Sequence, residues 1–180
     1  MKKILFSFLV MTTLTSYVTV AQRLVQSFIE KNSVGSSNFG YSGSSAGDVN
    51  GDGYNDIIVG APGYPATGCS YIYFGGNTSN KPDVILKGDV NCRSFGIAVS
   101  SAGDVNNDGY DDVIVGASGS SSIQGFAYIF FGGVTMDTDP DVKLTGEAIR
   151  DNFGCSVSSV GDINKDGFDD VVVGADGYSS

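Results

Sequence analysis

The chain has 180 residues and a formal net charge of −10, from 20 acidic and 10 basic side chains, with no histidine. Such an acidic chain disfavours nucleic acid and anionic lipid as partners and attracts divalent cations. Without histidine, a Ser-His-Asp or Cys-His catalytic site and a Cys/His zinc site are excluded within this sequence. Its 26 glycines, its many aromatic residues and its short apolar segments are typical of an all-β, turn-rich protein.

Residues 1–21 have the pattern of a secretory signal peptide. Lys2 and Lys3 precede a short apolar stretch, and Thr19 and Ala21 place small residues at positions −3 and −1 of a cut after Ala21. The apolar run is shorter than the ~20 residues that a membrane span needs. We therefore predict a cleaved signal, no transmembrane segment, and a protein that is secreted or displayed on the extracellular surface. Removal of the two lysines changes the net charge from −10 to −12.

Three segments of the chain repeat one another closely: residues 39–64, 95–120 and 153–178. The offsets are 56 residues (39 to 95) and 58 residues (95 to 153). A period of this size indicates stacked supersecondary units, none of which buries its own apolar face alone. The predicted organisation is a signal peptide (1–21), an N-terminal strand (22–38), repeat 1 (39–94), repeat 2 (95–152) and an incomplete repeat 3 (153–180).

Each unit is predicted to hold four short strands. The second strand is a run of β-branched residues, and such continuous apolarity indicates burial on both faces. The predicted strands are 42–46, 99–102 and 157–160 (first), 57–59, 113–115 and 171–173 (second), 71–74 and 126–131 (third), and 84–86 and 142–144 (fourth). A further strand at 24–29 has no unit of its own, and we expect it to complete a blade of a ring.

The three cysteines are an odd number for a chain bound for an oxidising compartment. Cys69 and Cys92 would close a small loop and are the favoured disulfide pair. Cys155 occupies the position of Tyr41 and Ile97 in the other repeats, which favours a small buried apolar side chain.

An acidic loop with the pattern D-x-N-x-D-G-[YF]-x-D follows the first strand of every unit. Oxygen ligands at alternate positions converge on one point only if the backbone turns sharply, which the glycine at position 6 permits. The predicted metal ligands occupy positions 1, 3, 5, 7 (through the backbone carbonyl) and 9. They are Asp48, Asn50, Asp52, Tyr54 and Asp56; Asp104, Asn106, Asp108, Tyr110 and Asp112; and Asp162, Asn164, Asp166, Phe168 and Asp170.

Such an all-oxygen set favours calcium, and we predict about three calcium ions, one for each loop. Carboxylates about 4 Å apart repel by roughly 4 kcal/mol at an effective dielectric constant of 20, which a cation relieves. An EF-hand or dockerin is excluded, because position 12 is Val59, Val115 or Val173 and a strand follows the loop. Asp111 and Asp169 lie beside the loops, and we expect them to belong to a solvated face.

These elements together resemble the FG-GAP repeat of integrin α-subunit N-terminal β-propellers, over about residues 24–180. The Phe-Gly openings are Phe39-Gly40, Phe95-Gly96 and Phe153-Gly154. The Gly-Ala-Pro element is Gly60-Ala61-Pro62, relaxed to Gly116-Ala117-Ser118 and Gly174-Ala175-Asp176. The resemblance implies propeller blades of four antiparallel strands, with structural calcium loops on one face of the ring and partner binding on the other.

The implied function is cell adhesion or protein recognition through an extracellular protein or matrix ligand, without enzymatic activity. About two and a half blades and an N-terminal closing strand make only a partial ring, since seven such units need roughly 400 residues. Unpaired strand edges then predict self-association. The alternatives are an accessory propeller fragment of a larger secreted enzyme, such as a phospholipase-D-like protein, or a truncated product without independent function.

Overall fold

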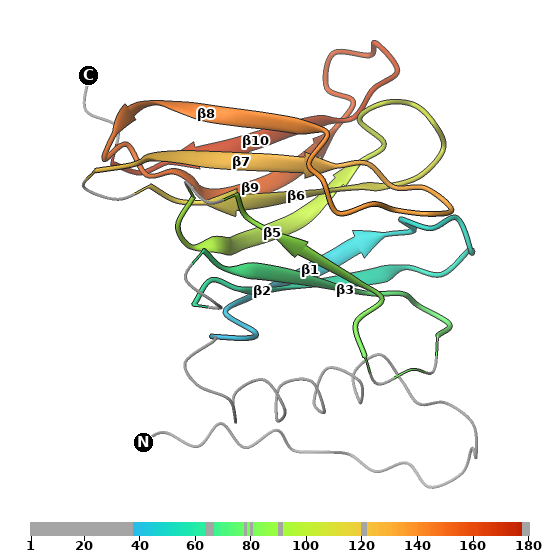
Figure 1. Ribbon diagram of the computed structural model, residues 1–180. Coiled ribbons are helices and arrows are strands. Elements are labelled where there is room, and N and C mark those ends of the chain that lie inside the picture. Colours follow the sequence, from blue (N-terminus) through green and yellow to red (C-terminus); the bar gives the residue numbers. More distant parts are fainter. Residues whose placement is uncertain are drawn as a thin grey trace, which may run out of the picture.

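The computed structural model describes residues 38–63, 67–77, 79, 81–89, 92–119 and 122–177, which form antiparallel sheets (Figure 1). The first sheet contains β1 (Ser42–Gly47), β2 (Asp56–Ala61), β3 (Cys69–Tyr73) and β4 (Val84–Lys87) in that order. The second contains β5 (Phe95–Gly103), β6 (Asp112–Ala117), β7 (Gln124–Phe130) and β8 (Val142–Ile149). The third pairs β9 (Phe153–Gly161) with β10 (Asp170–Ala175).

The all-β prediction is confirmed, and so is the four-strand order of the first two units; the third shows its first two strands in the described residues. We call the three sheets blade 1, blade 2 and blade 3. In the described residues, no helix is long and apolar enough to cross a membrane. The predicted signal peptide and the predicted strand at 24–29 lie outside the described residues.

Blades 1 and 2 pack face to face through an apolar layer. Ala46, Val49 and Ile58 of blade 1 and Phe95 and Val115 of blade 2 are buried in one cluster. The Phe95 ring lies 5.5 Å from the Tyr128 ring and 6.1 Å from the Phe130 ring, which completes the aromatic part of the layer. A second layer of the same kind, which includes Ile114 and Val173, joins blade 2 to blade 3.

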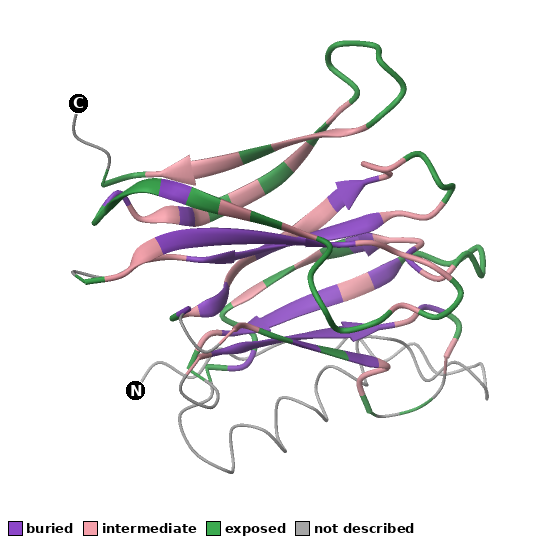
Figure 2. Cartoon of the chain, turned by 45° about the horizontal axis from the view of Figure 1, so that its top comes forward, coloured by how far each residue is buried: buried purple, intermediate pink, exposed green. Residues whose placement is uncertain are grey.

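The apolar run in β6 contributes to both layers, which confirms for this strand the prediction of burial on both faces. Val113 and Val115 belong to the cluster with blade 1, and Ile114 belongs to the cluster with blade 3. Successive side chains of a strand point to opposite faces of a sheet, so a central blade needs apolar residues at every position. The prediction is wrong for the run in β10, where Val172 is exposed because no described blade covers that face. Figure 2 shows this burial in blade 2 and the more exposed strands of blade 3.

The Phe-Gly opening of one blade lies directly on the Gly-Ala element of the blade before it. A Cβ atom on Gly60 would lie 2.0 Å from the carbonyl oxygen of Gly96, and a Cβ atom on Gly116 would lie 2.0 Å from that of Gly154. The hydroxyl of Ser42 donates a hydrogen bond to the same Gly96 carbonyl at 2.8 Å. The two glycine motifs therefore permit close backbone contact between blades.

Blade 3 presents an exposed apolar face among the described residues. Val160, Ile163 and Val172 are 44%, 72% and 52% exposed. Their equivalents in blade 2 are Ala102, Val105 and Ile114, all of which belong to the layer with blade 3. The exposed side chains therefore occupy the positions that a neighbouring blade covers elsewhere in the chain.

The favoured Cys69–Cys92 disulfide is wrong in this structure, where the three cysteines are thiols. Cys69 is buried with Phe39 and Tyr71, whereas Cys92 is buried in the layer between blades 1 and 2. The two side chains thus belong to separate apolar clusters and do not meet. Cys155 is half-buried rather than buried.

Candidate metal centres

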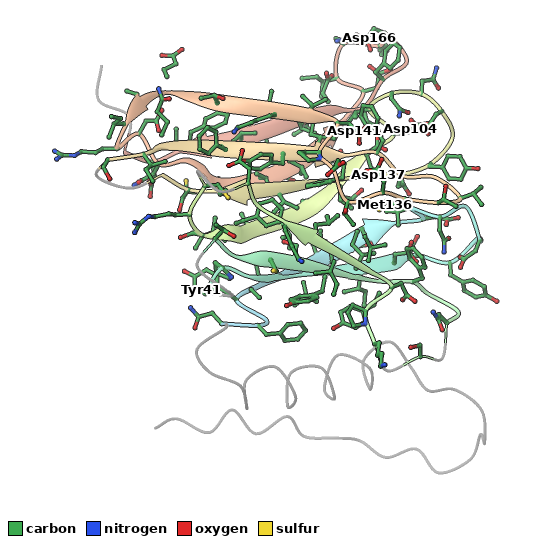
Figure 3. The ribbon with its side chains drawn as sticks, in the orientation of Figure 1. Tyr41, Asp104, Met136, Asp137, Asp141 and Asp166 are labelled. Carbon is green, nitrogen blue, oxygen red and sulfur yellow. The ribbon has the colours of Figure 1, made fainter. Side chains whose placement is uncertain are left out.

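The acidic loops connect the first and second strands of each blade, and all three lie at one end of the sheets. Asp104 and Asp166, from the second and third loops, project at this end, whereas Tyr41 lies at the opposite end (Figure 3). Asp137 and Asp141 of the β7–β8 connection lie on the loop side as well. The stacked blades therefore gather acidic side chains on one face of the assembly.

In the first loop, the side chains at positions 1, 3 and 5 turn inward. Asp48 Oδ1 and Asn50 Oδ1 both accept hydrogen bonds from the amide of Asp52, each at 3.0 Å. Asp48 Oδ2 accepts from the amide of Gly53 at 2.8 Å, and Asp52 Oδ1 accepts from that of Tyr54 at 2.9 Å. Two side-chain oxygens that accept from one amide are necessarily close, so the oxygens of Asp48 and Asn50 converge.

The second and third loops repeat this geometry. Asp104 and Asn106 both accept from the amide of Asp108, at 3.0 and 2.9 Å. Asp162 and Asn164 both accept from the amide of Asp166, at 3.1 and 2.8 Å. The amides at position 7 donate to the carboxylate at position 5 in every loop, and they belong to Tyr54, Tyr110 and Phe168.

The sharp turn that the sequence predicts at position 6 is present. Gly53, Gly109 and Gly167 have φ angles of 86°, 91° and 94°, where side chains with a Cβ atom are strained. Position 4 is also left-handed, with Asn107 at 57° and Lys165 at 64°. Two left-handed residues in a short loop bring the alternate side chains to one side.

The carboxylate at position 9 lies beneath the loop rather than at its surface in blades 1 and 2. Asp56 is fully buried, and its two oxygens accept hydrogen bonds from the amides of Val49 at 3.0 Å and Gly75 at 2.7 Å. Burial raises the pKa of Asp56 from 3.8 to about 6, and the charges of Asp52 and Asp48 add to this increase. Asp112 has the same surroundings in blade 2, and burial raises its pKa to about 6.

The acidic residue at position 8 contacts the preceding blade, which corrects the expectation of a solvated face. Asp111 Oδ2 accepts a hydrogen bond from the amide of Asp48 at 2.8 Å, and the amide of Asp111 donates to the Asp48 carbonyl at 3.2 Å. Asp169 makes the same pair with Asp104, at 3.1 Å in both directions. Both side chains are half-buried. The only sequence signal for this contact is that position 8 is aspartate in repeats 2 and 3 (Asp111 and Asp169) and asparagine in repeat 1 (Asn55).

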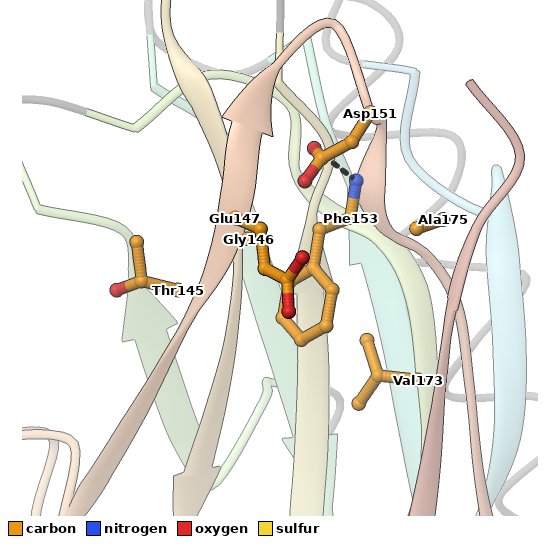
Figure 4. Close-up of a pocket in the computed structure, with 7 residues that line it drawn as sticks. All are labelled: Thr145, Gly146, Glu147, Asp151, Phe153, Val173 and Ala175. Atoms are coloured by element: carbon orange, nitrogen blue, oxygen red, sulfur yellow. Dashed lines mark hydrogen bonds between the residues drawn. The ribbon is translucent and has the colours of Figure 1, made fainter. Parts of the chain in front are cut away.

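A hollow lies between β8 and β10. It is lined by Gly146, Glu147, Asp151, Phe153 and Val173, among others (Figure 4). Asp151 accepts hydrogen bonds from the amides of Ala148 and Phe153, so its carboxylate caps a turn. In blade 2 the residue equivalent to Phe153 is Phe95, which packs against the rings of Tyr128 and Phe130 in the third strand, β7. The hollow beside Phe153 therefore corresponds to the place that β7 fills in blade 2.

The donor set fits a hard cation, although the carboxylates alone are not a complete site. In the ranges that the structure describes, no three acidic, histidine or cysteine side chains converge closely enough to hold a metal ion. The repeated loop supplies an amide oxygen and a backbone carbonyl as well as the carboxylates. Oxygen donors of these kinds are the ligands of calcium in proteins.

Two stacked four-stranded blades and the paired strands of a third, each with one acidic loop, are the repeat units of a β-propeller. The family model "FG-GAP repeat" matches residues 39–79, 95–130 and 153–180, and the chain belongs to this family.

The chain is also similar to several integrin α subunits. Integrin alpha-6 of Gallus gallus is 36% identical over 148 residues, which cover 77% of this chain and 13% of that protein. Integrin alpha-6 of Homo sapiens is 35% identical, over 77% of this chain and 12% of that protein. Integrin alpha-PS3 of Drosophila melanogaster is 34% identical, over 76% of this chain and 13% of that protein. The chain therefore spans a small part of the length of these relatives.

Proposed function

We propose that this chain is a calcium-binding segment of an FG-GAP β-propeller that acts outside the cell in adhesion or protein recognition. The observation that carries the proposal is the repeated loop, in which the side-chain oxygens of positions 1 and 3 meet at the position-5 amide in all three copies. Three loops with the same pattern of predicted ligands on one face are better explained by a common ligand than by solvated acidic turns. The similarity to integrin α subunits supports the adhesive role.

The calcium ion is structural in this proposal. The residues that would hold it are those predicted at positions 1, 3, 5, 7 and 9 of each loop. In blade 1, Asp56 joins the loop to the β3–β4 connection through Val49 and Gly75, so an ion held there would brace two connections of the blade. When bound, the ion supplies positive charge that relieves repulsion among carboxylates.

An enzymatic role has little support. The sequence contains no histidine, and of the two carboxylates in the hollow beside β10, Glu147 and Asp151, the second caps a turn. Recognition of an extracellular protein or matrix ligand is the proposed role of the assembled propeller. We place that recognition at the end opposite the loops, where Tyr41 is 62% exposed (Figure 3).

Thermal unfolding in calcium, in magnesium and after removal of metal tests the calcium proposal. Calcium at a hundredfold above its dissociation constant should stabilise the folded chain by about 2.7 kcal/mol per site. The variant Asp108→Ala should lose this increment for the second loop, because it removes the carboxylate that we predict as the ligand at position 5. Asp139→Ala, at an exposed acid outside the loops, is the matched control. Equal calcium shifts in the two variants would show that the ligands are misassigned.

A further inference from the structure

We infer that Asp111 and Asp169 are positioning residues that hold the first residue of the preceding blade's loop, so that two adjacent blades shape each of these candidate cation sites. The consequence for calcium rests on the proposed function. The interblade contact itself does not, because it is formed by hydrogen bonds within the protein. Position 8 thereby gains a role that the loop pattern alone does not assign to it.

The contact fixes the main chain of the position-1 residue from both sides. Asp48 donates its amide to Asp111 Oδ2 at 2.8 Å and accepts the amide of Asp111 on its carbonyl at 3.2 Å. The same residue supplies both side-chain oxygens to the loop amides of Asp52 and Gly53. Because the backbone of Asp48 is held, the direction of its carboxylate is held as well.

The fit around Asp111 is close. A Cβ atom on Gly47, which has a φ of 79°, would lie 2.3 Å from Asp111 Oδ2. A Cβ atom on Gly103 would lie 2.0 Å from Asp169 Oδ2 in the second interface. Glycine before position 1 therefore leaves the space that the carboxylate of the next blade occupies.

The three loops receive different degrees of support. In loop 1, the carbonyl of Val49 also accepts a hydrogen bond from the amide of Gly133 at 2.7 Å. The ring of Tyr110 packs closely on the same loop, since a Cβ atom on Gly51 would lie 2.6 Å from it. Loop 2 has the paired contact with Asp169. For loop 3, no other blade offers an acceptor to the Asp162 amide among the described residues, and Asp162 is exposed. We expect metal-free loops 1 and 2 to be better ordered than loop 3.

Residue-specific amide hydrogen exchange on the metal-free full chain tests the contact. The amides of Asp48 and Asp104 should exchange at least about tenfold more slowly than the Asp162 amide, as expected when a charge-assisted hydrogen bond protects them. In Asp111→Ala, exchange at Asp48 should accelerate about tenfold while exchange at Asp104 is unchanged. Asn55→Ala is the matched control, because position 8 of blade 1 contacts no preceding blade among the described residues and should leave both amides unchanged.

Asp111→Asn separates the hydrogen bond from the charge, since its amide oxygen still accepts from Asp48. If the Asp48 amide stays protected from exchange in Asp111→Asn and loses this protection in Asp111→Ala, the contact is supported. Equal exchange at Asp48, Asp104 and Asp162 in the unmodified chain would overturn the inference, and this comparison needs no variant to fold.

Calcium titration by calorimetry then tests the coupling. Asp111→Ala should weaken one site about tenfold and leave the others unchanged. Unchanged affinity at every site would overturn the coupling. If no form of the chain binds calcium, the proposed function fails, and the exchange result still decides whether the contact exists.

Discussion

Replacement of Gly60 by alanine should destabilise the chain at the contact between blades 1 and 2. The added Cβ atom would lie 2.0 Å from the Gly96 carbonyl oxygen and 2.3 Å from Ser42 Oγ, so the Phe-Gly turn of blade 2 must move away. Overpacking of this kind costs about 1–3 kcal/mol. Loss of the Ser42–Gly96 hydrogen bond adds about 1 kcal/mol, and the lower entropy of the unfolded alanine chain offsets about 0.4–1 kcal/mol. The net loss should be roughly 1–3.5 kcal/mol.

The assay is urea unfolding followed by circular dichroism at one fixed calcium concentration. Gly43→Ala is the matched control in the same blade, because its new Cβ atom would lie 3.8 Å from the nearest atom, the Ile58 carbonyl oxygen. This control should be neutral or stabilised by up to about 1 kcal/mol. If Gly60→Ala were as stable as Gly43→Ala, the close contact between the two glycine motifs would not contribute to packing.

Two further predictions concern charge and the exposed face. In metal-free protein, the free energy of unfolding should rise by about 1 kcal/mol for each of Asp56 and Asp112 as the pH falls from 7 to 5. Their folded pKa of about 6 exceeds the usual 3.8, so the folded state binds more protons in this range, and Asp56→Asn should remove its share of the gain. The chain should also self-associate through the exposed face of Val160, Ile163 and Val172, and Val172→Lys should reduce the light scattering. A monodisperse monomer at high concentration would refute the last prediction.

The repeat allowed most of the fold to be predicted from the sequence. The β-branched run that recurs in the three repeats predicted the second strands, β2, β6 and β10. The acidic loops predicted the turns that precede them. The limits of β5 and β9 were predicted too short, because both strands begin at the Phe-Gly motif. The register of β5 against β6 shifts between Phe95 and Ala98, and such an irregularity interrupts the alternation on which strand prediction depends.

Contacts between blades were the part that the sequence did not reveal. The role of Asp111 depends on a partner 63 residues earlier in the chain, and one acidic side chain beside an acidic loop carries no sign of that partner. The expected pairing of Cys69 with Cys92 failed for the same reason. Their short separation in sequence suggested a small loop, whereas the stacking of blades places the two thiols in different apolar clusters.

Calcium stoichiometry tests the central claim most directly. Purified chain, dialysed against a known calcium concentration and analysed for its metal content, should contain about three calcium ions per chain when free calcium exceeds roughly 10⁻³ M. The variant Asp108→Ala should contain about one fewer. Absence of bound calcium under these conditions, or zinc in its place, would contradict the assignment of the three loops as calcium sites.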